Sequence, residues 1–233
     1  MIYYYDLHIH TVLSPCADVL MTPNNIFNMA MLKGLDVIAI TDHNSAKQLP
    51  ICEEISKSYD ILFIPGIEVS VKEGFHVLVY FKCVADALKF DEILENFLKK
   101  QDVDLSIYNE QVITDIHDEK LAIYPYLLLA DTCLTFKDLI SLLKDFEILI
   151  GYAHLDRNKH SGIDFVHHIA LDFVELTHHV SEAFIEKHLL DRYTILMSSD
   201  AHQITDLLEK QRTNKIELDH LTIDSFFRYF HHG

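Results

Sequence analysis

Short apolar runs that end in histidine or carboxylate residues are the feature of this sequence that most constrains its fold. The runs at residues 35–40, 148–153 and 194–197 are nearly all apolar, with many β-branched residues. Such runs are typical of parallel strands that are buried on both faces. Segments with helical spacing separate them, and this order of strands and helices predicts an α/β fold with a parallel sheet.

The apolar run at residues 2–5 leads into His8 and His10, which are separated by a single residue. Side chains two positions apart on a strand point to the same side. The two imidazoles would therefore project together from one strand end, as a pair of ligands for one metal ion. The simpler alternative places both histidines on the polar face of an edge strand. The metal site is favoured, because His, Asp or Glu follows the other predicted strands as well.

Residues that can bind metal recur at the ends of the predicted strands. They are His8, His10, His43, Glu68, His76, His154, Asp200 and His202. These six imidazoles and two carboxylates exceed the three or four ligands that one ion needs. A carboxylate such as Glu68 can bridge two ions, so the set indicates two or three divalent metals. Mixed imidazole and carboxylate ligation favours zinc, manganese or iron over magnesium or calcium.

About seven strands with polar residues at their ends favour a closed or nearly closed barrel, which gathers its active residues at one face. Pro65 and Gly66 are expected to separate two of these strands. An open doubly wound sheet is the alternative, but the sequence contains neither of the glycine-rich phosphate-binding motifs. The length of 233 residues fits a single domain. Residues 101–147 are the least readable segment, and we expect them to be helix-rich.

The net charge of −17 weighs against a long nucleic-acid substrate. Asp and Glu outnumber Lys and Arg by 36 to 19, whereas duplex binding normally rests on a basic surface. The four cysteines form no C-x-x-C pair, which indicates reduced thiols. Neither a signal-peptide pattern nor an apolar run of about 18 residues is visible, so we expect a cytoplasmic protein without a membrane span.

Six short blocks follow one another between residues 6 and 202. They are His8-Ile-His10-Thr, Thr41-Asp-His43-Asn, Pro65-Gly-Ile-Glu68, the His76-Val-Leu run, Ala153-His154-Leu-Asp-Arg157 and Ser199-Asp200-Ala-His202. In type and order, these blocks resemble the PHP (polymerase and histidinol phosphatase) superfamily. The resemblance implies a single PHP domain over residues 1–233, folded as a distorted (β/α)7 TIM-like barrel. It also implies a trinuclear centre with up to nine ligands that hydrolyses phosphoesters.

The resemblance assigns all eight strand-end residues to the metal centre and adds a ninth ligand, from the loop after His10. Counting back five residues from Pro23 assigns Asp18, whereas counting forward from His10 reaches Pro15 or Cys16. We assign Asp18 and keep Cys16 as the alternative, because a thiolate is a good zinc ligand.

The hypothesis for the reaction is a hydroxide, formed at two or three cations, that attacks phosphorus in line with the leaving alcohol. Glu68 would bridge the cations, and His10 or His202 could protonate the leaving group. Arg157 is predicted to pair with the substrate phosphate, with a surface salt bridge as its alternative. Asp42 is expected to orient a ligand or neighbouring backbone rather than bind metal.

We expect the substrate to be a small phosphomonoester of the nucleotide, sugar phosphate or histidinol phosphate type. One alternative is a phosphodiesterase or 3′–5′ exonuclease that acts on short oligonucleotides. Another is a non-catalytic PHP module that stabilises a partner. An amidohydrolase is disfavoured, because no lysine suited to carry a carbamate follows a predicted strand. Glu175, His178 and His179 also lie after a predicted strand, but we do not assign them as ligands.

Overall fold

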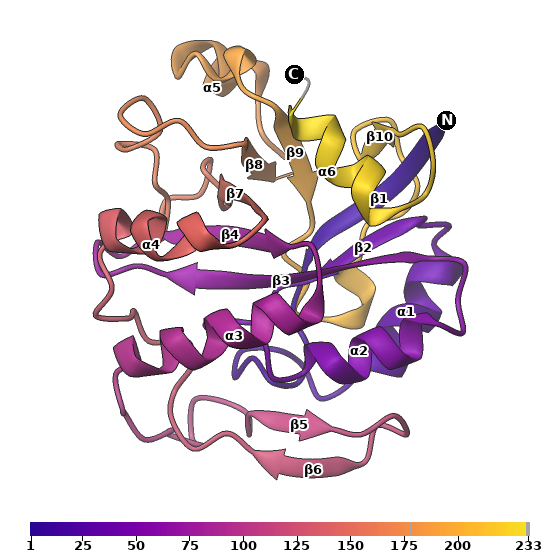
Figure 1. Ribbon diagram of the computed structural model, residues 1–233, viewed down its shortest axis with the longest axis vertical. Coiled ribbons are helices and arrows are strands. Elements are labelled where there is room, and N and C mark those ends of the chain that lie inside the picture. Colours follow the sequence, from indigo (N-terminus) through magenta and orange to yellow (C-terminus); the bar gives the residue numbers. More distant parts are fainter. Residues whose placement is uncertain (178, 232–233) are drawn as a thin grey trace.

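A computed structural model of the protein describes residues 1–177 and 179–231, and His178 lies outside the described residues. Its centre is a curled eight-stranded sheet with the strand order β10-β1-β2-β3-β4-β7-β8-β9 (Figure 1). The strands are β1 (Ile2–Ile9), β2 (Val37–Ile40), β3 (Leu62–Ser70), β4 (His76–Phe81), β7 (Ile148–Tyr152), β8 (Phe173–Thr177), β9 (Ile195–Ser198) and β10 (Lys215–Glu217).

The helices follow the strands along the chain. They are α1 (Pro23–Leu32), α2 (Leu49–Ser56), α3 (Val84–Leu94), α4 (Phe136–Leu142), α5 (Glu182–Lys187) and α6 (Ile223–His231). Pro23 begins α1 directly after Thr22, as proline at the first helical position predicts. Among the described residues, we find no helix that is both long and apolar enough to cross a membrane.

Backbone hydrogen bonds bring the two ends of the sheet together. His10 N donates to Ala201 O at 3.0 Å, and Ala201 N donates to His8 O at 3.1 Å. Ala201 follows β9, so these bonds join β9 to β1 and close the seven strands from β1 to β9 into a distorted barrel. The additional strand β10 pairs antiparallel with the start of β1. The prediction of an α/β, TIM-like barrel with seven strands is confirmed.

The sheet is mixed rather than fully parallel, which corrects the expectation from the sequence. Strand β4 runs antiparallel to both of its neighbours, β3 and β7. Its first residue, His76, therefore pairs with Ser70 at the carboxyl end of β3. This reversal brings the amino end of β4 to the same mouth of the barrel as the carboxyl ends of the parallel strands.

Pro65 and Gly66 do not break the chain into two strands, because both lie within the continuous strand β3. Pro65 pairs with Ile40 of β2. A Cβ atom on Gly66 would lie 2.8 Å from Thr41 Cγ2 and 3.2 Å from Val79 O. The glycine therefore allows the close approach of neighbouring strands rather than a turn.

Aromatic side chains of α6 close the other mouth of the barrel. Phe226, Phe227 and Phe230 are buried there, in a core cluster that also contains Tyr80 and Phe173. The ring centroids of Tyr80 and Phe173 lie 5.2 Å apart in a stacked arrangement. This end of the barrel is filled with packed side chains, whereas the predicted metal ligands lie at the opposite mouth.

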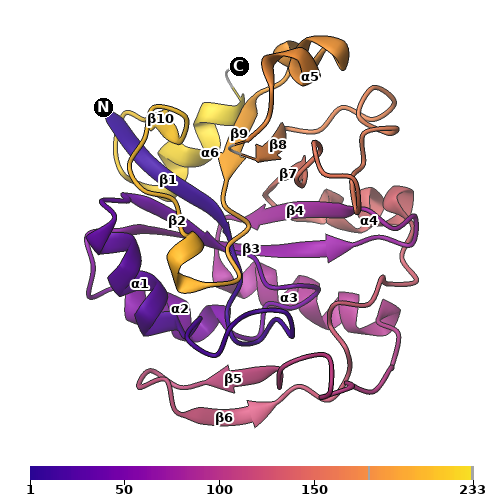
Figure 2. The ribbon, with the colours of Figure 1, turned by 180° about the vertical axis from the view of Figure 1, so that it is seen from behind.

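The expectation of a helix-rich segment over residues 101–147 is wrong. Its central part is the hairpin of β5 (Val112–Thr114) and β6 (Lys120–Ile123), and α4 is its only α-helix. In the views of Figures 1 and 2 the hairpin lies beyond helices α1 to α3. Asp118 in its turn accepts a hydrogen bond from Thr22 Oγ1 at 2.6 Å, which attaches the hairpin to the start of α1. The β-branched run in β5 favours a strand.

Candidate metal centre

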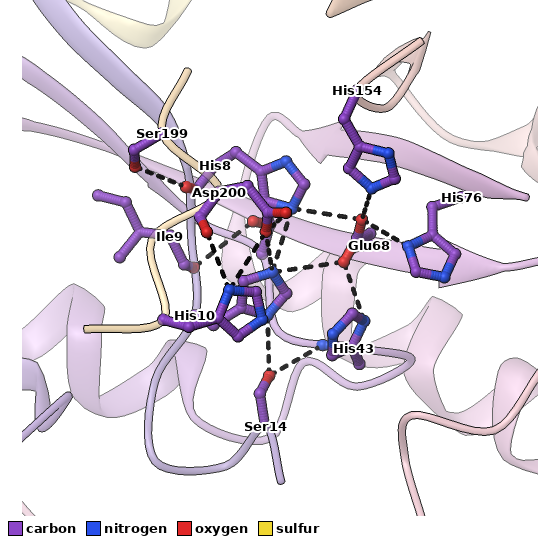
Figure 3. Close-up of polar contacts among 12 residues, drawn as sticks. His8, Ile9, His10, Ser14, His43, Glu68, His76, His154, Ser199 and Asp200 are labelled. Carbon is purple, nitrogen blue, oxygen red and sulfur yellow. Dashed lines mark hydrogen bonds and ion pairs between the residues drawn. The ribbon is translucent and has the colours of Figure 1, made fainter. Parts of the chain in front are cut away.

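All eight strand-end residues predicted as ligands meet at the open mouth of the barrel, and all of them except His202 are labelled in Figure 3. Seven of them are buried, and His202 is half-buried. His8 and His10 come from β1 and its end, Glu68 from β3, and His76 from β4; His43, His154, Asp200 and His202 follow β2, β7 and β9. The fold thus brings together residues that are up to 194 positions apart in the sequence, from His8 to His202.

Glu68 lies at the centre of this cluster. Its Oε1 is 2.9 Å from His76 Nδ1 and 3.0 Å from His154 Nε2. Its Oε2 is 2.9 Å from His43 Nδ1 and 3.3 Å from His10 Nε2. Oε1 also lies 3.4 Å from His8 Nε2. One fully buried carboxylate therefore faces five imidazoles, three at Oε1 and two at Oε2, and a carboxylate in such a position can bridge two cations.

A second group of ligand atoms gathers around Asp200. The Nε2 atoms of His8 and His10 lie 3.1 Å apart. Asp200 Oδ1 is 3.2 Å from His8 Nε2 and 3.0 Å from His10 Nε2. The ligand atoms of His8, His10, Glu68 and Asp200 all lie within 4.8 Å of one another, as do those of His43, Glu68 and His76.

Several ligand atoms in the cluster are buried without a hydrogen-bond partner. They are His43 Nδ1, Glu68 Oε2, His76 Nε2 and His154 Nδ1. His43 Nδ1 and Glu68 Oε2 are close, but they are not aligned for a hydrogen bond. A buried polar atom without a partner costs about 1–3 kcal/mol, so four of them in one cluster need a compensating interaction. Divalent cations bound by imidazole and carboxylate would supply it, and the residues therefore fit the predicted metals.

The protonation states of two histidines also suit metal binding. Burial lowers the pKa of His43 to about 3 and that of His202 to about 4. Both imidazoles are therefore neutral near pH 7, which is the form that binds a metal. A neutral His202 is a poor proton donor, so its environment favours the predicted ligand role over protonation of a leaving group.

Charged neighbours shift the pKa values of Glu68 and His10 against the effect of burial. Burial alone would raise the pKa of Glu68, but the charges of His76 and His8 hold it well below its usual range. Burial likewise disfavours a charged His10, yet the hydrogen bond that it donates to Asp200 and the negative charge of Glu68 raise its pKa to about 9. The metal-free cluster is thus a network of ionised carboxylates and imidazolium groups.

Glu175 holds two of the ligands in place, a role that the sequence did not reveal. Both of its carboxylate oxygens lie 3.0 Å from His8 Nδ1, and its Oε1 accepts a hydrogen bond from His154 N at 3.0 Å. Nδ1–H of His8 therefore points to Glu175, and Nε2 points into the cluster. The available signal was a carboxylate in the otherwise apolar run of β8, because a buried glutamate is rare unless it is paired.

Asp42 orients its surroundings, in agreement with its expected role. Its Oδ1 accepts hydrogen bonds from Thr11 N and Ser14 Oγ, both at 2.7 Å, and its Oδ2 accepts one from Thr11 Oγ1 at 2.7 Å. These bonds fix the loop that follows His10.

The same loop contains both candidates for the ninth ligand. Asp18 is half-buried, and its Oδ1 accepts a hydrogen bond from Leu20 N at 2.8 Å. Cys16 lines the cavity above the cluster. Among the described residues, neither belongs to a group of converging ligand atoms. Asp18 therefore stays a prediction, and Cys16 stays its alternative at the cavity wall.

The cavity over the cluster has a volume of about 500 Å³. Besides the ligands, its walls include Leu129, Arg157, Lys159 and His160. The Arg157 side chain is 42% exposed and forms an ion pair with Asp200 Oδ2. The predicted contact of Arg157 with phosphate stays a prediction, but the guanidinium lies at the rim where a substrate would enter.

One stretch of the chain is similar to a curated nuclease. Over 68 residues it is 43% identical to the 5′–3′ exoribonuclease Rnm of Salmonella typhimurium, which is 28% of this chain and 22% of that protein. The matched stretches cover less than half of the length of the curated relatives.

The fold is similar to solved structures along nearly its full length. The lesion-specific endonuclease PfuEndoQ from Pyrococcus furiosus superposes with a TM-score of 0.70 and 22% identity, over 98% of this chain and 55% of that chain. A proposed metal-dependent phosphoesterase from Bifidobacterium adolescentis gives a TM-score of 0.61 and 16% identity, over 98% and 96% of the two chains. Residues 6–217 match the model of the PHP domain. The chain therefore belongs to the PHP domain family.

Proposed function

We propose that this protein is a hydrolase of phosphoester bonds that uses two or three divalent cations, zinc, manganese or iron. The observation that carries the proposal is Glu68, a buried carboxylate that faces five imidazoles from four segments of the chain. Cations bound at such a site lower the pKa of a water molecule and neutralise charge on the phosphate. The eight strand-end residues would hold them, with Asp18 or Cys16 as a ninth ligand.

The protein's own groups would then orient the substrate. Arg157 would bind phosphate oxygens, because its exposed guanidinium sits at the rim of the cavity and matches their geometry. Leaving-group protonation by His10 is less favourable, since its ring is fully buried between Glu68 and Asp200. A water molecule at the open cavity is the better proton source for the leaving alcohol.

We favour a small phosphomonoester as the substrate. The cavity of about 500 Å³ is large enough for a single nucleotide or sugar phosphate. Arg157 and Lys159 place two positive charges at its rim, in a protein whose net charge is −17. Two basic residues at the rim of a strongly acidic protein favour short anions over a long nucleic acid.

A nuclease is the second candidate, because the similar stretch of 68 residues belongs to an exoribonuclease. Its substrate would be the end of a short oligonucleotide, which brings a single terminal nucleotide into the cavity. That relative is a 5′–3′ enzyme, opposite in direction to the 3′–5′ exonuclease expected from the sequence, so this second candidate has no assigned direction.

Metal analysis combined with two substrates tests these alternatives. Protein without a histidine tag is analysed for bound elements, and hydrolysis of p-nitrophenyl phosphate is compared with that of its bis ester. Two to three equivalents of metal with faster turnover of the monoester would support a small-molecule phosphatase. Preference for the bis ester, followed by cleavage of short oligonucleotides, would support the nuclease. Less than one equivalent and no turnover after manganese addition would overturn the proposed hydrolase and favour a non-catalytic module.

A further inference from the structure

A buried hydroxyl links His10 to Asp42. Ser14 Oγ lies 3.0 Å from His10 Nδ1 and donates to Asp42 Oδ1 at 2.7 Å. It also accepts a hydrogen bond from His43 N at 3.2 Å. All four residues are buried, and Ser14 and His10 are fully so, which excludes water as a competing partner.

The hydrogen-bonding capacity of Ser14 determines which nitrogen of His10 carries the proton. A serine hydroxyl has one proton to donate and two lone pairs that accept. Its proton goes to Asp42 Oδ1, which also accepts the N–H of Thr11 and so acts as an acceptor. One lone pair receives the N–H of His43. The remaining lone pair can only accept a hydrogen bond, and Nδ1 of His10 is therefore the protonated nitrogen.

The consequence is a fixed ligand atom. Nε2 faces Asp200 Oδ1 at 3.0 Å and Glu68 Oε2 at 3.3 Å. When a cation displaces one proton of the imidazolium, Nδ1 keeps its proton on Ser14, and the lone pair that binds the cation is therefore on Nε2. His8 reaches the same state by a direct bond from Nδ1 to Glu175. The two histidines of the H-x-H pair are therefore oriented by different devices, a carboxylate for His8 and a hydroxyl relay for His10.

We propose that Ser14 is a positioning residue of the metal centre. It fixes the tautomer of His10 and, through His43 N, ties together the two loops that follow β1 and β2. This inference deepens the proposed function and rests on it. The Ser14 side chain can be removed without removing the hydrogen bonds of the turn. These are backbone bonds, from Ser14 N to Thr11 O and from Ala17 N to Ser14 O.

Zinc affinity of the full chain tests the proposal, measured by competition with a chromophoric chelator. Ser14→Ala should weaken zinc binding by about 10- to 100-fold, as expected when a group that orients a ligand is lost. Asp42→Asn, which keeps an acceptor for Ser14 but removes the charge, should weaken it less. Ser70→Ala is the matched control: Ser70 is also fully buried, lies two residues after Glu68, and its Oγ has no partner. Its zinc affinity should equal that of the wild type.

Nitrogen-15 spectra of the zinc-loaded protein give a second readout that a purely structural role would not change. The wild type should show His10 with a protonated Nδ1 and a ligating Nε2, and Ser14→Ala should lose this single tautomer. Unchanged zinc affinity and an unchanged His10 tautomer in Ser14→Ala would overturn the role of Ser14 alone. If the wild type takes up no metal, both this role and the proposed function are overturned. If Ser14→Ala fails to fold, Asp42→Asn decides by the same two readouts.

Discussion

At the scale of single residues, the site buries several charged side chains close together. They are tolerated only because the carboxylates and the imidazolium groups neutralise one another. Glu68 and the imidazoles around it are buried, and a buried charge without a partner is strongly destabilising. Each ligand is therefore also a structural partner of the next. Removing one should affect metal content and protein stability together.

Replacement of Glu68 by glutamine is the sharpest test at this scale. The amide keeps the shape of the side chain but loses the charge that faces five imidazoles. We expect fewer bound metals and a fall in phosphoester turnover of at least about 100-fold, the upper end of what loss of a supporting group costs. Elemental analysis and steady-state kinetics check this, with the exposed Glu53→Gln as control. Wild-type turnover in Glu68→Gln would contradict the bridging role.

Metal uptake should release protons. Against the effect of burial, the neighbouring carboxylates raise the pKa of His10 to about 9 and that of His8 well above its usual value. Both imidazoles are therefore protonated at pH 7 in the metal-free protein, and each must lose its proton to bind a cation. Zinc affinity should consequently rise as the pH increases from 7 towards 9.

Calorimetry at pH 7 in two buffers of different ionisation enthalpy counts the released protons. Equal heats of zinc binding in both buffers would contradict the prediction, since they would mean that no proton leaves.

The sequence predicted which strand-end residues meet in the fold, but not which residues orient them. The eight ligand positions follow predicted strands, and barrel topology brings strand ends together. Glu175 and Ser14 could not be assigned in this way, because their roles depend on hydrogen bonds to His8 and His10 across the folded chain. Spacing carries no information on such contacts.

At the scale of elements, the apolar runs predicted the buried strands, but they did not predict that β4 runs antiparallel to its neighbours. His76 begins its strand, and neither composition nor periodicity shows whether a buried strand runs parallel or antiparallel. The hairpin of β5 and β6 was missed because its two strands are three and four residues long, too short for a period to be read. Its attachment depends on Asp118 contacting Thr22, 96 residues away.

Gly151 in β7 tests how tightly neighbouring strands must pack. A Cβ atom there would lie 2.2 Å from Phe173 Cε2, and the Phe173 ring is fully buried against Tyr80. Gly151→Ala should lower the free energy of unfolding by roughly 1–3 kcal/mol, measured by urea denaturation. Phe173→Leu in the same background should recover part of this loss. Additive effects of the two substitutions would show that the predicted clash does not exist.

At the scale of the whole molecule, the barrel has one packed end and one reactive end. The α6 aromatics fill the first, whereas the second gathers six imidazoles and two carboxylates from segments that span most of the chain. Cations at this mouth would connect β1, β3, β4 and the loops after β2, β7 and β9. The metal centre should therefore contribute to the stability of the entire fold.

Removal of metal should accordingly lower the melting temperature of the protein. A ligand present at 100 times its Kd stabilises the folded state by about 2.7 kcal/mol, and each kcal/mol shifts the melting temperature of a domain of this size by roughly 2–4 °C. Dialysis against a chelator should thus reduce Tm by roughly 5–10 °C, and restored zinc or manganese should reverse the change. Scanning calorimetry at fixed free metal measures it. The same Tm with and without metal would mean that cations do not bind preferentially to the folded cluster, and the assignment of the eight ligands would fail with it.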